Sequence, residues 1–196
     1  MISGSKKQSM CMQIITLCVL GFCVGLVLHA EDASRTVVDD LVKHWQISKD
    51  LSLAVAKAMP EVNYSFKPPN AEFGFANQMG NIALVNVLSC TMALGTRAPE
   101  RFQSAFDRPM DLTKIGVMKS LTVAYDYCID GLKQMNDADL LKMAVFAGHS
   151  EPKFDIPKFD ILWEAYAHAT HGLGEVEIYL RLKGIPSPNT GPPYKF

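Results

Sequence analysis

Residues 157–183, PKFDILWEAYAHATHGLGEVEIYLRLK, decide the fold of this chain. Successive residues of an α-helix lie about 100° apart around its axis, so each position determines the side on which a residue falls. With His168 set at zero, the apolar and small residues gather between about 40° and 140°; they are Leu162, Ala165, Ala169, Gly172, Leu173, Val176 and Leu180. Gly184 and Pro186 then end the helix. The stretch therefore predicts one long helix with a single buried face.

Three further segments repeat this helical spacing and are separated by helix breakers. They run over residues 34–59, 70–95 and 111–135, with Asn70 and Asp111 as the predicted N-caps of the second and third. A shorter piece, Asp137–Ala147, predicts a helical turn or two within the next connection. No stretch alternates apolar and polar residues for long enough to indicate a sheet. We therefore predict an all-α fold, a four-helix bundle with long crossover connections, one of them over residues 96–110.

The first thirty residues have the layout of a secretory signal peptide. Lys6 and Lys7 precede an apolar run from Ile14 to Leu28, and Ala30 supplies a small residue at the cleavage point. The run is shorter than the roughly 20 residues that span a bilayer, so no stable membrane span is expected after cleavage. The layout predicts export to the periplasm or secretion.

Composition limits the classes of function. The chain has 196 residues, 48% of them hydrophobic, so it can bury a core of its own. Its formal net charge of -1 argues against a nucleic-acid partner, because binding to phosphate backbones rests on clustered basic residues. A small-molecule ligand and a homodimer both stay open. The predicted boundaries are a signal peptide over 1–30, a bundle over 31–188 and an extended tail over 189–196.

Cleavage after Ala30 leaves two cysteines, Cys90 and Cys128. In an oxidising compartment they can form one disulfide. Alternatively, they are two buried thiols that pack as small apolar side chains. Sequence spacing does not reveal whether their Cα atoms come within reach of a bridge, so both alternatives stay open.

His168 and His171 are the histidines whose spacing bears on chemistry. Side chains three or four residues apart share a helix face, and two imidazoles so placed can hold zinc or nickel when another helix adds a third ligand. The helical wheel puts His168 at the edge of the buried face. It puts Glu164, His171 and Glu175 between about 300° and 340°, on the solvated side. A metal role and a pair of partly exposed histidines therefore both remain open.

The run from His168 to Pro186, HATHGLGEVEIYLRLKGIP, resembles the last helix of DinB-like (YfiT-like) proteins. The pattern of that family is a His, three residues, a second His, then Arg-Gly-Gln, an apolar residue and Tyr-Leu-Arg before Gly and Pro. Residues 59–68 and 80–83 are similar to the first connection and the second helix of the family. The resemblance spans residues 41–188 and implies a four-helix bundle.

Members of this family typically bind one divalent metal through three histidines, one on the second helix and two on the last. At the matching positions this chain has Asn81, His168 and Gly172, so the resemblance implies that one ligand of three survives. Asparagine is a poor ligand for zinc or nickel, and glycine has no side chain. We therefore predict a small polar network at the former metal position, with a direct or water-bridged hydrogen bond between Asn81 and His168. His171 would complete a metal site only if the last helix were rotated or locally distorted.

Two functions follow from the resemblance. The leading hypothesis is an exported binding or accessory protein with a degenerate metal pocket formed by His168, Asn81 and His171, which holds zinc or nickel weakly or not at all. The alternative is a divalent-metal-dependent hydrolase or thiol-dependent transferase in which His168, His171 and Glu175 hold the ion. The sequence does not decide whether the chain is an enzyme, and it identifies no catalytic residue, substrate or thiol cofactor.

Overall fold

The computed structural model describes residues 36–103, 110–147 and 153–188. The chain divides into two compact units, Met1–Thr36 and Val37–Phe196, and the following description concerns the second. The predicted signal peptide over 1–30 and the predicted tail over 189–196 lie outside the described residues.

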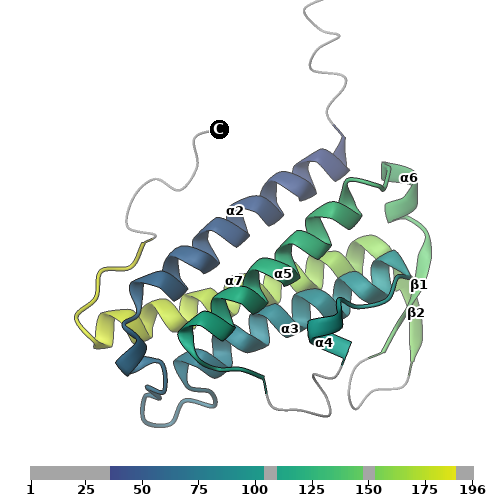
Figure 1. The fold of residues 1–196 in the computed structure, drawn as a ribbon. Helices are drawn as coiled ribbons and strands as arrows, with labels where there is room; N and C mark the ends of the chain where they lie inside the picture. The colour runs from purple at the N-terminus through teal and green to yellow at the C-terminus, as the bar shows by residue number, and fades with distance from the viewer. Residues whose placement is uncertain (1–35, 104–109, 148–152, 189–196) are drawn as a thin grey trace, which may run out of the picture. The chain divides into compact units, whose positions relative to one another are not determined.

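Four long helices lie side by side and form the bundle: α2 (Val37–Ala58), α3 (Phe75–Leu94), α5 (Lys114–Leu132) and α7 (Lys158–Leu182). α3 packs on α5 and α7, and α2 packs on the same two helices (Figure 1). This arrangement confirms the predicted helical bundle. Throughout the three described ranges, every helix is too short or too polar to cross a membrane.

The connection between α3 and α5 is a crossover, as predicted. α5 begins beside the end of α2, where Lys114 Nζ donates to the carbonyl oxygen of Met59 at 2.7 Å. α3 and α5 run in the same direction (Figure 1), and they end together, with Leu94 packed directly on Gly131. The connection therefore returns along the bundle, and its described part includes the short helix α4 (Glu100–Gln103).

Two helices begin at residues other than those predicted. α3 begins at Phe75 rather than near Asn70, because its first amides donate to carbonyl oxygens of the loop that follows the 3-10 turn η2 (Glu61–Asn63). Asn70 lies in that loop with a φ of 64°, in the left-handed region that asparagine tolerates. α5 begins at Lys114 with Thr113 as its N-cap, and Asp111 instead accepts a hydrogen bond from Thr113 Oγ1 at 2.7 Å.

The prediction of helix over Asp137–Ala147 is correct only for its first turn. The short helix α6 (Asp137–Leu140) is followed by β1 (Met143–Phe146), which pairs antiparallel with β2 (Phe154–Pro157) in a two-stranded sheet. Four residues in each strand are too few for an alternating pattern to be recognised in the sequence. The hairpin is an addition to the bundle and packs against α3 and α7.

The buried face predicted for the last helix is confirmed. All seven predicted residues are buried: Leu162, Ala165, Ala169, Gly172, Leu173, Val176 and Leu180. The largest buried side chains come from all four long helices and include Trp45, Met79, Tyr125 and Leu162. One apolar core therefore holds the bundle together.

Polar and sulfur-containing side chains are buried around α5 as well. Cys90 of α3 and Cys128 of α5 form a disulfide with Cα atoms 5.5 Å apart, which decides between the two alternatives left by the sequence. Tyr125 Oη lies 2.8 Å from both Ser48 Oγ and Ser52 Oγ of α2. Burial raises the pKa of Tyr125, so its hydroxyl stays protonated near neutral pH. We call this set of five side chains the α5 core.

Candidate functional site

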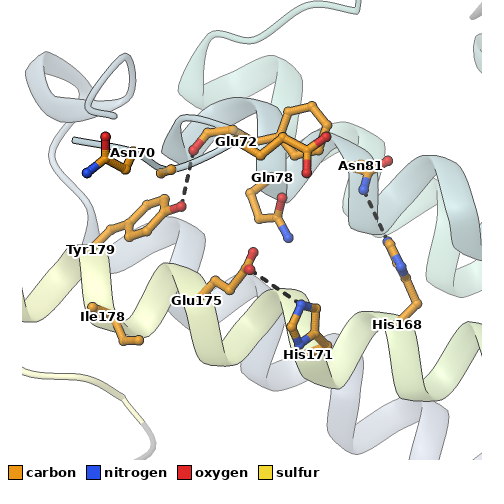
Figure 2. Close-up of a pocket in the computed structure, with 11 residues that line it drawn as sticks. Asn70, Glu72, Gln78, Asn81, His168, His171, Glu175, Ile178 and Tyr179 are labelled. Atoms are coloured by element: carbon orange, nitrogen blue, oxygen red, sulfur yellow. Dashed lines mark hydrogen bonds and ion pairs between the residues drawn. The ribbon is translucent and has the colours of Figure 1, made fainter. Parts of the chain in front are cut away.

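A cavity of about 370 Å³ opens between α3, α7 and the loop before α3 (Figure 2). We call it the α3–α7 pocket. Its lining combines amides, imidazoles and carboxylates with apolar and aromatic side chains: Asn70, Ala71, Glu72, Phe73, Gln78, Asn81, His168, His171, Glu175, Ile178 and Tyr179. A volume of this size lies at the lower end of the range for small-molecule sites, about 300 to 1,000 Å³.

Tyr179 holds the loop wall of the pocket against α7. Its hydroxyl donates to the carbonyl oxygen of Phe73 at 3.1 Å, and its ring packs edge-on against Phe66 with centroids 6.2 Å apart. Burial, followed by the charge of Glu175, raises the pKa of Tyr179. The hydroxyl is therefore a protonated donor that is already engaged.

Asn81 and His168 form the hydrogen bond that the sequence predicts. Asn81 Nδ2 lies 3.1 Å from His168 Nε2 (Figure 2). Burial of the half-buried imidazole, and next the neighbouring His171, lower the pKa of His168, while Glu164 and Glu175 oppose that shift. His168 is thus held in its neutral form, in which its Nε2 accepts a hydrogen bond from the Nδ2 group of Asn81.

Gly172 lies where the resemblance places the third metal ligand, and neighbouring side chains have closed this position. A Cβ atom at residue 172 would lie 3.0 Å from both Gln78 Nε2 and Ile82 Cγ1. These distances are shorter than ordinary van der Waals contact, so any side chain at residue 172 would have to displace its neighbours. A ligand side chain at this position would therefore require Gln78 and Ile82 to shift.

His171 does not join Asn81 and His168. Its side chain is 73% exposed at the rim of the pocket, and its Nε2 lies 3.3 Å from Glu175 Oε1. Among the described residues, no three His, Cys, Asp or Glu side chains are grouped so that they could hold a metal ion. The donors at this position, one imidazole and one amide, do not fit the three-histidine metal site of the family.

Gln78 is the residue of the pocket that the sequence analysis missed. It lies one helical turn before Asn81 and points toward the cavity (Figure 2), yet only 4% of it is exposed. Within the described part of the chain, its Oε1 has no hydrogen-bond partner. The sequence did offer a signal, because Gln78 is a second amide beside Asn81 on the same face of an otherwise apolar helix. Its lack of a hydrogen-bond partner, however, depends on the shape of the cavity.

By its fold the chain is a DinB-like four-helix bundle. Two solved structures of DinB-like proteins match it. The one from Bacillus cereus has a TM-score of 0.64 and 13% sequence identity, covering 80% of this chain and 99% of that one. The one from Bacillus subtilis has a TM-score of 0.54 and 16% identity, covering 74% of this chain and 92% of that one.

These matches establish the fold that the sequence resemblance implies. No protein family profile matches the chain, and no curated protein matches it either. At such low identity, the chemistry of this chain has to be argued from its own residues.

Proposed function

We propose that this chain is an exported DinB-like protein whose α3–α7 pocket binds a small molecule directly, without a resident metal ion. The observation that carries the proposal is the closed position at Gly172, where Gln78 and Ile82 take the space that a third ligand would need. The pocket itself remains, and it is lined by polar groups that can hold an organic ligand in place.

The chemistry of the remaining donors supports this proposal. Catalytic zinc sites use three protein ligands and keep one position open for water. Here His168 supplies one imidazole, Asn81 supplies an amide bonded to it, and His171 pairs with Glu175 at the rim. A single neutral imidazole does not reach the metal affinity of a three-ligand site. The metal-dependent hydrolase or transferase therefore remains the weaker alternative.

Two independent features support export. Lys6 and Lys7 precede the apolar run of a signal peptide. The protein has a disulfide between Cys90 and Cys128, and disulfides form and persist in oxidising compartments. A binding or accessory role in the periplasm or outside the cell is consistent with both.

Metal content tests the proposal directly. The mature protein is equilibrated with zinc or nickel, dialysed, and examined by elemental analysis beside its His168→Ala variant. We expect far less than one metal ion for each chain in both samples, because the wild type already lacks the three ligands that retain an ion and the variant has one imidazole fewer. One ion for each wild-type chain, lost in His168→Ala, would favour the metalloenzyme and overturn the proposal.

A further inference from the structure

The buried amide of Gln78 points to the kind of molecule that the pocket accepts. Buried polar atoms nearly always have a hydrogen-bond partner, and leaving one without a partner costs free energy. Gln78 is almost fully buried, and its Oε1 finds no partner among the described residues, although the residue lines a cavity. A ligand that donates a hydrogen bond would supply the missing partner.

The rest of the lining includes two carboxylates, which are hydrogen-bond acceptors. The amide of Asn81 is engaged with His168, and the hydroxyl of Tyr179 is engaged with the loop. The carboxylates of Glu72 and Glu175 stand at the rim of the same cavity. His171 offsets Glu175 when it is protonated, which still leaves the charge of Glu72. The pocket therefore complements a ligand that carries N–H donors and positive charge.

The apolar part of the lining fits the same chemistry. The side chains of Phe73, Ile178 and Tyr179 also line the cavity. Apolar side chains cover the carbon skeleton of a small ligand, and aromatic faces attract cations. The volume of about 370 Å³ suits a ligand with one ring or a short chain rather than a peptide.

We propose that the α3–α7 pocket binds a small organic cation, an amine or a guanidinium compound, whose N–H group donates to Gln78 Oε1 while Glu175 and Glu72 neutralise its charge. The inference deepens the proposed function and rests on it, since a resident metal ion would repel such a ligand.

Benzylamine is the probe for this proposal, with benzyl alcohol and benzoate as neutral and anionic molecules of nearly equal size. Binding to the mature protein is followed by amide chemical shifts in NMR, which also show whether the probe lies between α3 and α7. We expect benzylamine to bind at least about tenfold more tightly than the other two, the difference that one charge-assisted hydrogen bond produces.

Three variants locate the interaction. Gln78→Met removes the amide but keeps the length of the side chain, and Glu175→Gln removes the charge at the partly exposed rim without disturbing the core. Each should weaken benzylamine binding by about tenfold. Glu164→Gln is the matched control, since Glu164 is an exposed glutamate of the same helix outside the pocket lining, and it should weaken binding far less than Glu175→Gln does.

The outcomes separate this inference from the proposed function. If benzyl alcohol or benzoate binds in the pocket of metal-free protein as tightly as benzylamine, the preference for a cation is refuted. The proposed function, a pocket for a small molecule, would still stand. Binding of benzylamine that Glu175→Gln and Glu164→Gln reduce equally would also overturn it. No binding of any probe to metal-free protein would refute it as well, whereas one metal ion for each chain in elemental analysis would refute the proposed function first.

Discussion

The polar groups between α2 and α5 and those between α3 and α7 are arranged in opposite ways. In the α5 core, the hydroxyl of Tyr125 lies within 2.8 Å of Ser48 and Ser52, and all three side chains are buried. In the α3–α7 pocket, Gln78 is equally buried but its Oε1 has no partner in the described part of the chain, and it faces a cavity.

The difference teaches how to separate structural polar groups from functional ones in a single bundle. A buried network whose members bond to one another stabilises the native state. An unpaired buried amide weakens the native state unless a water molecule or a ligand pairs with it, and Gln78 lines a cavity that can admit one. The two regions should therefore respond to substitution with opposite signs, and the experiments below test this contrast.

The largest effect is expected from the disulfide of the α5 core. The double variant Cys90→Ala/Cys128→Ala opens a loop with a sequence separation of 38 residues. Loop-closure entropy predicts a loss of about 4 kcal/mol in the free energy of unfolding. Denaturant titration measures the loss, and the wild type under reducing conditions should show the same midpoint. An unchanged midpoint in both would mean that the bridge does not stabilise the α5 core.

Filling the closed position of the pocket should have the next largest effect on stability. Gly172→His forces Gln78 and Ile82 to move, so overpacking should lower the free energy of unfolding by about 3 kcal/mol. Gly174→His is the matched control on the same helix, since nothing lies within 4 Å of a Cβ atom there. Thermal unfolding of both variants, with and without zinc, gives the comparison. A stable Gly172→His variant that binds zinc would show that the metal position is still open.

Removing one hydroxyl tests the closed network. Tyr125→Phe leaves Ser48 and Ser52 without their shared partner, so the free energy of unfolding should fall by about 2 kcal/mol. Tyr127→Phe is the control, because that hydroxyl bonds Thr96 at the surface and Thr91 at a half-buried position, so its loss should cost less. Equal effects of the two variants in denaturant titration would contradict the special role of the buried network.

The corresponding substitution in the pocket should change the free energy of unfolding in the opposite direction. Gln78→Met removes an unpaired buried amide, so the free energy of unfolding should rise by up to about 1 kcal/mol while benzylamine binding weakens. Gln46→Met on the exposed face of α2 should change stability by less than about 0.5 kcal/mol. Lower stability of Gln78→Met would indicate that this amide is a structural group like those of the α5 core.

The smallest effect concerns pH. Because burial lowers the pKa of His168, the unfolded chain, with an ordinary histidine pKa of 6.5, takes up its proton first as the pH falls. The stability from the neutral imidazole is thus present above pH 6.5 and is lost as the pH falls toward the lowered value. Unfolding midpoints at pH 7.5 and 5 should therefore differ more in the wild type than in His168→Gln. Equal differences would place His168 in an environment like that of the unfolded chain.

The sequence predicts those features that depend on helical periodicity. The buried face of α7 follows from residue spacing, and the bond between Asn81 and His168 follows from matching two positions to a family pattern. The hairpin of β1 and β2 is missed because each strand has four residues. The disulfide stays one of two alternatives and the unpaired state of Gln78 is missed, because both depend on distances between helices, which no local pattern encodes.

The disulfide between α3 and α5 also changes how the chain responds to being cut. It encloses the whole crossover connection within a covalent ring, since Cys90 lies before that connection and Cys128 after it. A protease that cleaves one peptide bond anywhere inside the ring releases no fragment, because the sulfur bridge still joins the two pieces. A protein with this topology can be nicked once in the connection between α3 and α5 and remain a single covalent molecule.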